Sequence, residues 1–436
     1  MPEEPSSASA PYSRRAFLSW SGRGLLAAAV AGEVLSGGTA RAAAPSEPAS
    51  KPLKVPSMHA KTEQESGPVP EPLPPGKRVG FAVVGLGALS LNQIIPAFGS
   101  CKKAKLAAVV SGSPEKARQV AREHGLPDTA VYDYKTYDNL KDNKEADVIY
   151  IVLPNGMHAE YTVRGAKAGK HILCEKPMAN SVAECQQMIT ACNEAGRKLM
   201  IAYRIQYEPH HAIVKKWLRE KKYGATKLIE AVNGQNQGDP SQWRQDKKLA
   251  GGGSLPDVGL YCLNTLRFLI GEEPTEVSGM IYSTPGDPRF KEVEENVTWQ
   301  MRFPGGILTN CATGYGFHES RRYRVHAESG WFGLDPAFSY QNLKMESSHA
   351  EGPIEYRETP GIMPKDQFAL EMDHMAECVL DDKRPYTPGE EGLQDQRIME
   401  AIYESASSGK PVRIVTPGSG AGKLDLFRGE APKTTA

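Results

Sequence analysis

The segment GGGSLPDVGLY, from Gly251 to Tyr261, contains an acid and a phenol that could move protons. Asp257 and Tyr261 are four residues apart, and on a helix this spacing places two side chains on one face. A carboxylate beside a phenol could take up and return the proton of a hydroxyl group. The alternative interpretation is a tyrosine that only packs on a helix.

The stretch GLGALS predicts a second site. Gly85 and Gly87 permit the tight turn and the close backbone approach that a pyrophosphate needs at a helix N-terminus. Ser90 stands where the usual fingerprint has a third glycine. Alone, this pattern could be a plain tight turn. An apolar strand before it, a helix after it and a second strand further on favour dinucleotide binding.

The end of the second predicted strand, VVSGSPEKAR, bears on which dinucleotide binds. A site that prefers NAD keeps an acid there for the ribose hydroxyls. This chain has Ser111 at that point and Lys116 soon after it, so a 2′-phosphate would meet a hydroxyl and a positive charge. Taken singly, Lys116 could be a solvated helix residue. The pair favours NADP.

The stretch CEKPM, from Cys174 to Met178, lies at the carboxyl end of a predicted strand. Open α/β sheets bind their ligands at this end. Lys176 would there be close to the nicotinamide and could polarise a hydroxyl group. A surface lysine is the alternative, since EKP is short enough to occur by chance.

The elements that must position these residues fall into two parts. Up to Tyr203, buried strands alternate with amphipathic helices, which predicts a Rossmann doubly wound parallel sheet over 80–203. After residue 225, six strand-like segments separated by turn residues predict a large open, mostly antiparallel sheet. Two amphipathic helices follow. The predicted fold class is therefore α/β, with a C-terminal α+β domain over 204–436 for substrate and oligomerisation.

Composition excludes some classes of protein. The 436 residues suffice for two domains, and 52 basic residues balance 52 acidic ones. A net charge of zero argues against a nucleic-acid partner. The 7 cysteines form no CxxC or Cys/His cluster, so we expect buried thiols and no metal site.

The N-terminus resembles a cleavable twin-arginine export signal over 1–42. Arg14 and Arg15 precede an apolar run, and Ala40–Ala42 fits the small-residue cleavage site of such a signal. The run is too short to span a bilayer and Glu33 interrupts it, so we expect no stable membrane anchor. These features predict passage through an export translocon to the periplasm. Residues 43–79 form a proline-rich arm, either a spacer or a strap across its own domain or a neighbouring subunit.

Motifs along most of the chain together resemble the Gfo/Idh/MocA oxidoreductases. Most members of that family have a histidine where this chain has Tyr261, and the members that couple glucose oxidation to fructose reduction have a tyrosine. The resemblance runs from about residue 78 to about residue 415. The motifs are GLGALSLNQ, LPNGMHAEY, AGKHILCEKPM, YRIQYEP, QWRQDKKLAGGGSLPDVGLYCLN and EEGLQDQRIMEAIYE.

The resemblance implies that Lys176, Asp257 and Tyr261 handle the proton of a sugar hydroxyl while its carbon gives hydride to NADP. Lys176 would help the phenol to lose its proton. The resemblance also implies a homo-oligomer, a tetramer or a dimer, with sheets face to face and the N-terminal arm over NADP. With the residues derived above, the predicted cofactor-binding set is Gly85, Leu86, Gly87, Ala88, Leu89, Ser111, Lys116, Leu153, Asn155, His158, Glu175, Lys176, Arg204, Trp243 and Arg244.

The chain departs from the glucose–fructose members at two places. They have a lysine where this chain has Ala88, which removes one positive charge near the phosphates. The stretch YRIQYEPHH is expected to place four further side chains around the sugar pocket and so to change the sugar preference. These are Ile205, Gln206, His210 and His211.

Export and NADP binding together predict a closed catalytic cycle. An exported enzyme cannot draw on a soluble NADP pool, so a cofactor kept through both half-reactions is expected. The predicted function is a periplasmic sugar oxidoreductase that oxidises an aldose, glucose, to its lactone and reduces a second sugar, fructose, to the alditol by a ping-pong route. The alternatives are an exported NAD(P)-dependent glycosidase of the same fold, a simple NADP-dependent aldose dehydrogenase, and a non-catalytic binding protein.

Overall fold

The computed structural model describes residues 73–414 and 428–431. The predicted export signal over 1–42 lies outside these residues, and so does the proline-rich arm up to residue 72. Among the described residues, no helix has both the length and the apolar character needed to cross a membrane.

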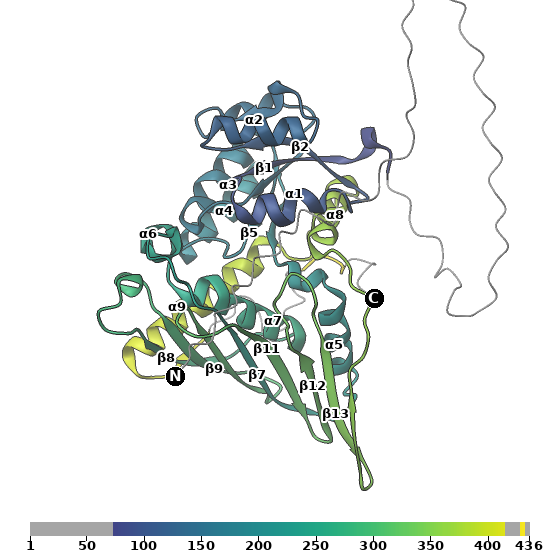
Figure 1. Ribbon diagram of the computed structural model, residues 1–436, viewed down its shortest axis with the longest axis vertical. Helices are drawn as coiled ribbons and strands as arrows, with labels where there is room; N and C mark the ends of the chain where they lie inside the picture. The colour runs from purple at the N-terminus through teal and green to yellow at the C-terminus, as the bar shows by residue number, and fades with distance from the viewer. Residues whose placement is uncertain (1–72, 415–427, 432–436) are drawn as a thin grey trace, which may run out of the picture. The chain divides into compact units, whose positions relative to one another are not determined.

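The first part of the described chain is a six-stranded parallel sheet with strand order β3-β2-β1-β4-β5-β6 (Figure 1). This order is that of a doubly wound Rossmann sheet, which confirms the predicted fold. The order reverses between β1 and β4, and the crevice at that switch point is where such sheets bind ligands. The strands are β1 (Val79–Val84), β2 (Ala104–Val110), β3 (Val131–Tyr132), β4 (Val148–Ile151), β5 (His171–Glu175) and β6 (Leu199–Ala202).

Helices cover both faces of this sheet, so its central strands are apolar along their whole length. Every residue of β1 is buried, as expected for a parallel strand between two helical layers. The Ser181 side chain caps one helix by accepting a hydrogen bond from the backbone N–H of Glu184 at 3.2 Å. The helices are α1 (Ile95–Ala97), preceded by a π-helical turn over Ser90–Ile94, α2 (Pro114–Glu123), α3 (His158–Lys167) and α4 (Val182–Glu194).

The second part contains a nine-stranded sheet with order β14-β13-β12-β11-β7-β10-β9-β8-β15. All neighbouring strands are antiparallel except β7 and β10, so the predicted mostly antiparallel sheet is confirmed. The strands are β7 (Thr226–Gly234), β8 (Glu276–Tyr282), β9 (Asn296–Arg302), β10 (Leu308–Gly314), β11 (Ser320–Ala327), β12 (Gly330–Leu334), β13 (Met345–Glu351), β14 (Ile354–Glu358) and β15 (Val412–Arg413).

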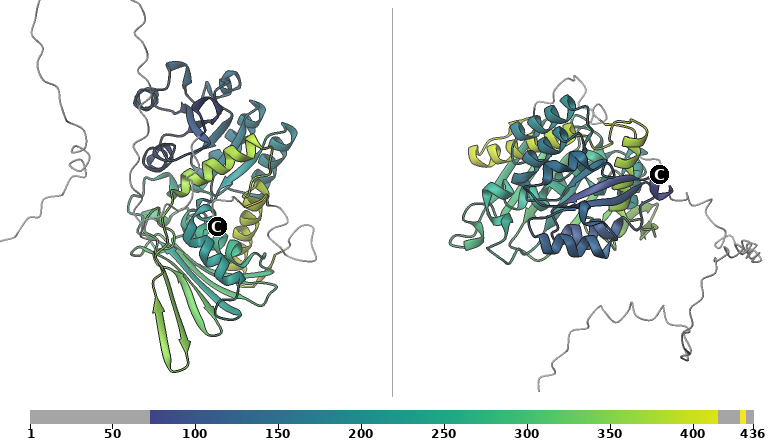
Figure 2. Two further views of the ribbon diagram at one scale, coloured as in Figure 1. Left: turned by 90° about the vertical axis from the view of Figure 1, so that its right-hand side faces the viewer. Right: turned by 90° about the horizontal axis from the view of Figure 1, so that it is seen from above.

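One face of the nine-stranded sheet is covered by helices α5 (Pro209–Arg219), α7 (Leu260–Ile270) and α9 (Gly389–Ser408) (Figure 2). Buried and exposed residues alternate along β9, with Val297, Trp299 and Met301 turned to the helices. Met280 and Tyr282 of β8 are exposed on the opposite face. The sheet therefore has one core face and one face that no described element covers.

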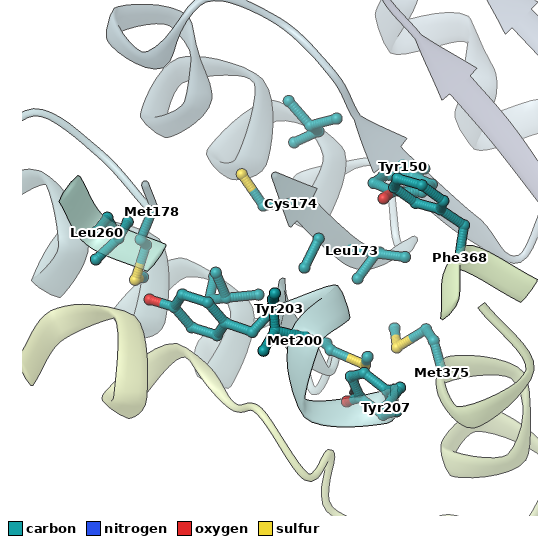
Figure 3. Packing of buried hydrophobic residues seen from close by; sticks show 14 of the residues in the cluster. Tyr150, Leu173, Cys174, Met178, Met200, Tyr203, Tyr207, Leu260, Phe368 and Met375 are labelled. Carbon is teal, nitrogen blue, oxygen red and sulfur yellow. Dashed lines mark hydrogen bonds between the residues drawn. The ribbon is translucent and has the colours of Figure 1, made fainter. Parts of the chain in front are cut away.

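The C-terminal helices also hold the two parts together. The Asp373 carboxylate of α8 (Gln367–Leu380) accepts hydrogen bonds from the backbone N–H groups of Lys102, Lys103 and Ala104 at 2.7, 2.7 and 3.0 Å. Figure 3 shows Phe368 of the same helix beside Tyr150 of β4. Helix α8, which the sequence assigns to the C-terminal domain, therefore packs on the Rossmann sheet and fixes the cleft between the two sheets.

Candidate functional site

A pocket of about 690 Å³ lies between the carboxyl ends of the Rossmann strands and the nine-stranded sheet. The structure brings together in its wall all the predicted catalytic and cofactor-binding residues except His158. They are Gly85, Leu86, Gly87, Ala88, Leu89, Ser111, Lys116, Leu153, Asn155, Glu175, Lys176, Arg204, Trp243, Arg244, Asp257 and Tyr261.

The glycine turn after β1 forms one end of the pocket. Gly85 has a positive φ of 94°, and a Cβ atom there would lie 2.2 Å from the Val152 carbonyl oxygen, so no larger residue fits. The Ser90 hydroxyl donates a hydrogen bond to the Gly85 carbonyl oxygen and closes the turn. At Gly87, by contrast, nothing stands where a Cβ atom would be. This bare backbone at a helix N-terminus fits a pyrophosphate.

The end of β2 lines the same part of the pocket with hydroxyl groups and one cation. Ser111 accepts a hydrogen bond from the backbone N–H of Ser113 at 3.1 Å, and Lys116 lies over the glycine turn with Nζ 3.4 Å from the Leu86 carbonyl oxygen. Ser113 and Tyr134 complete this region, and sequence analysis missed both. Ser113 belongs to the stretch VVSGSPEKAR. Its hydroxyl, two residues after that of Ser111, was the feature from which it could have been predicted.

Lys176 follows β5 and joins the two domains at the other end of the pocket. Its ammonium donates a hydrogen bond to the Asp257 carbonyl oxygen at 2.7 Å and lies 3.7 Å from Oδ1 of the same residue. Asp257 lies in a π-helical turn over Leu255–Gly259 that leads directly into α7, where Tyr261 is the second residue. The acid and the phenol therefore reach the same pocket, as their spacing predicts.

Asp257 is held as a carboxylate. Burial by itself would raise its pKa, but Arg244, Lys176 and the Tyr315 hydroxyl lower the pKa to about 2. The Arg244 Nε and the Tyr315 hydroxyl both donate to Oδ2, at 2.9 and 2.7 Å. Asp257 is therefore an acceptor and an orienting group at neutral pH, and it does not supply protons.

Tyr315 is a residue that sequence analysis missed. It follows β10, 58 residues after Asp257, and is fully buried. No motif marks it, because only the packing of β10 against the π-helical turn brings its hydroxyl to the carboxylate.

The cation on the Tyr261 oxygen is Arg204, whereas the sequence led us to expect Lys176. The Arg204 Nε donates to the Tyr261 hydroxyl at 3.2 Å, and the Lys176 ammonium lies over the ring, 4.4 Å from its centroid. Arg204 was predicted among the cofactor-binding residues. It lines the pocket, but its other hydrogen bonds go to the carbonyl oxygens of Phe338 and Ser339 and to the Gln367 side chain.

His158 was predicted to contact the cofactor, but it does not line the pocket. It is a buried residue that supports two loops. Its Nδ1 lies 2.8 Å from the Pro177 carbonyl oxygen and its Nε2 lies 2.9 Å from the Leu153 carbonyl oxygen. The imidazole thus connects the turn after β5 to the loop after β4. Burial is the largest influence on the pKa of His158 and lowers it, while the contacts with the two carbonyl oxygens act in the opposite direction.

Three of the four side chains expected around the sugar pocket lie in the interior instead. His210 and His211 both bind the buried carboxylate of Glu208, with Nδ1–oxygen distances of 2.6 and 2.9 Å. Gln206 donates to Asn264 at 2.8 Å, and Ile205 is buried. The prediction for Gln206, His210 and His211 was therefore wrong, because the segment turns into the interior after β6. Ile205 lines a small cavity together with Lys176 and Tyr261. The polar wall of the pocket comes instead from Asn233, Gln235 and Arg321.

Gly253, one of the glycines ahead of Asp257, packs closely against Glu294. The Glu294 carboxylate accepts hydrogen bonds from the backbone N–H groups of Gly253 and Leu255 at 2.7 and 2.9 Å. A Cβ atom on Gly253 would lie 1.9 Å from the Glu294 carbonyl oxygen. The loop can carry no side chain there, and its close fit holds the turn that presents Asp257.

The described residues offer no metal site. There, no three His, Cys, Asp or Glu side chains are grouped so that they could hold a metal ion. All 7 cysteines are buried and unpaired, which confirms the expected buried thiols.

Two models of one protein family match the chain. The model of an oxidoreductase family with an NAD-binding Rossmann fold, GFO_IDH_MocA, matches residues 79–203, and the model of its C-terminal alpha/beta domain matches residues 218–414. The D-xylose 1-dehydrogenase [NADP(+)] of Haloarcula marismortui is 31% identical over 350 residues, which are 77% of this chain and 93% of that protein. A second such enzyme, D-xylose 1-dehydrogenase (NADP(+)) 2 of Haloferax volcanii, is 28% identical over 335 residues, 77% of this chain and 99% of that protein.

A solved structure is also similar. The crystal structure of aldose-aldose oxidoreductase from Caulobacter crescentus complexed with glycerol is 42% identical, with a TM-score of 0.75. The similarity covers 77% of this chain and 100% of that chain.

Proposed function

The chain belongs to the Gfo/Idh/MocA oxidoreductase family, and we propose that it is an exported sugar oxidoreductase that keeps NADP bound while one sugar is oxidised and a second is reduced. The family resemblance drawn from the motifs is thereby confirmed. The observation that carries the proposal is the pocket, which joins a glycine turn at one end to Lys176, Asp257 and Tyr261 at the other.

The catalytic residues support hydride transfer from a sugar hydroxyl. Bound NADP supplies the hydride acceptor and, once reduced, the donor. Tyr261, acting as the phenolate, takes the proton of the aldose C1 hydroxyl as the C1 hydride leaves, and a lactone forms. In the second half-reaction Tyr261 returns that proton to the carbonyl oxygen of the second sugar. Arg204 contacts the phenol oxygen of Tyr261 and Lys176 lies over its ring, so both cations stabilise the negative charge of the phenolate.

The cofactor is NADP. Ser111, Ser113 and Lys116 offer two hydroxyls and one positive charge where an NAD site has an acid, and no carboxylate lines this end of the pocket. The D-xylose 1-dehydrogenases to which the chain is similar are named as NADP(+) enzymes.

Replacing Ser111 with aspartate is expected to weaken NADP binding at least tenfold and to improve NAD binding, because the new carboxylate repels a 2′-phosphate and accepts from ribose hydroxyls. Fluorescence titration with each dinucleotide measures both affinities. The Ser100→Asp variant adds the same charge at an exposed site outside the pocket and serves as the control. Equal NADP affinity in Ser111→Asp and the original protein would disprove this assignment.

The second sugar is the finer part of the proposal. Tyr261 in place of the common histidine favours the glucose-fructose oxidoreductase type, with glucose oxidised and fructose reduced. The similarity to an aldose-aldose oxidoreductase favours a second aldose as the alternative acceptor. A simple NADP-dependent aldose dehydrogenase remains the rival, because the xylose dehydrogenases share this family.

Location and assembly are part of the same proposal. Arg14 and Arg15 with the apolar run after them support export to the periplasm through a twin-arginine translocon. The uncovered face of the nine-stranded sheet exposes Met280, Tyr282 and Leu308, which supports a homo-oligomer, a dimer or a tetramer, with such faces in contact.

The test is to purify the exported protein without added cofactor and to follow the absorbance band of reduced nicotinamide. Glucose should produce a band stoichiometric with protein, and fructose or a second aldose should remove it. If glucose produces the band and no second sugar removes it, the protein is a simple dehydrogenase. Protein without bound nucleotide, or a band that no sugar changes, would overturn the proposal.

A further inference from the structure

We propose that Tyr340 is a substrate-binding residue that contacts the sugar beside Tyr261, an inference that rests on the proposed function. Tyr340 lies on the loop between β12 and β13 and lines the pocket. It is 42% exposed, whereas its neighbour Phe338 is buried. Both side chains line the pocket, and Tyr340 is the more exposed of the two.

Arg204 links Tyr340 to the catalytic phenol. The Arg204 guanidinium carbon is 4.6 Å from the centroid of the Tyr340 ring and 4.8 Å from the centroid of the Tyr261 ring. Its Nε also donates to the Tyr261 hydroxyl. One buried cation thus contacts both rings, and a sugar that reaches Tyr261 comes within range of Tyr340.

The loop that carries Tyr340 is held in place before any substrate arrives. Arg204 donates to the carbonyl oxygens of Phe338 and Ser339 at 2.7 and 3.3 Å, and Gln367 donates to the Tyr340 carbonyl oxygen at 2.8 Å. The Tyr340 ring also packs on Phe368, with a centroid distance of 5.5 Å. A binding residue fixed in this way loses little freedom when a ligand binds, which favours affinity.

The chemistry of Tyr340 suits a sugar. An aromatic ring with a hydroxyl tip can pack against the C–H groups of a sugar ring and hydrogen-bond with its hydroxyls. Partial burial and the nearby Tyr261 raise the pKa of Tyr340, so its hydroxyl keeps its proton and can donate. Gln235 and Arg321 line the same pocket and add further polar contacts for hydroxyl groups.

The test compares Tyr340→Ala and Tyr340→Phe in the full-length protein with its bound NADP. In single-turnover reduction of the cofactor by glucose, Tyr340→Ala should raise the half-saturating glucose concentration at least tenfold and lower the maximal rate less than threefold. Tyr340→Phe keeps the ring and should raise that concentration about threefold. Tyr356→Ala is the control, because Tyr356 is 40% exposed on β14 outside the pocket and should leave both constants unchanged.

The outcomes separate this inference from the proposed function. If the original protein oxidises glucose and neither Tyr340 variant changes the half-saturating concentration, Tyr340 only covers Arg204 and the inference is wrong. The same holds if the maximal rate falls and the half-saturating concentration does not change. If Tyr340→Ala loses NADP or its native circular dichroism spectrum, the half-saturating glucose concentration of Tyr340→Phe decides the test. An original protein that oxidises no aldose would overturn the proposed function itself.

Discussion

Replacing Tyr261 with phenylalanine is expected to lower the rate of aldose oxidation by about 10²–10⁴-fold, the usual contribution of a positioned proton-transfer group. The phenylalanine ring keeps the packing on Phe338, 6.0 Å away between centroids, and the contact with the Lys176 ammonium. Only the hydroxyl that Arg204 contacts is lost. The bound NADP should therefore remain, and the half-saturating sugar concentration should change little.

Stopped-flow reduction of the bound cofactor by glucose measures this prediction directly, without product release. Tyr282→Phe is the matched control, since Tyr282 is exposed on β8 and does not line the pocket. A Tyr261→Phe variant that reduces its cofactor as fast as the original protein would remove Tyr261 from the mechanism.

Replacing Arg267 with methionine is expected to lower the free energy of unfolding by about 3–5 kcal/mol, the typical result of removing one partner from a buried ion pair. Arg267 is on α7, fully buried, and binds the carboxylates of Glu273 and Asp395. Burial raises the pKa of Asp395 to about 6 even though Arg267 lowers it, and the nearby Glu391 carboxylate adds to the rise. Without the guanidinium these carboxyl groups are left in the interior with less compensation.

Urea unfolding of the Arg267→Met variant, followed by circular dichroism, tests the prediction. Lys198→Met is the control, because Lys198 pairs with Asp382, whose side chain is 98% exposed, and should change the midpoint far less. Equal midpoints for Arg267→Met and the original protein would show that this cluster contributes nothing to stability. Because α7 also carries Tyr261, the destabilised variant is expected to lose sugar oxidation at lower urea concentrations as well.

Local motifs were sufficient to predict much of the site. The glycine turn, Ser111, Lys116 and Lys176 each follow a buried strand, and the carboxyl ends of parallel strands meet at one edge of a sheet. The hairpin of β13 and β14 was not predicted, because the stretch MESSHAE has no alternation of apolar and polar residues. His158 and the pair His210 and His211 were misplaced, because a polar residue near a motif can face the pocket or the layer beneath it.

The sequence by itself determined the fold class, the family and the residue types that carry the chemistry, since these depend on short contiguous patterns. The tertiary structure alone decided which groups tune that chemistry. Tyr315 reaches Asp257 from the end of β10, and Arg204 crosses from the Rossmann edge to Tyr261 and the loop of Tyr340. The physical reason is that these contacts join separate elements, and their distances are set by strand pairing and helix packing rather than by spacing along the chain.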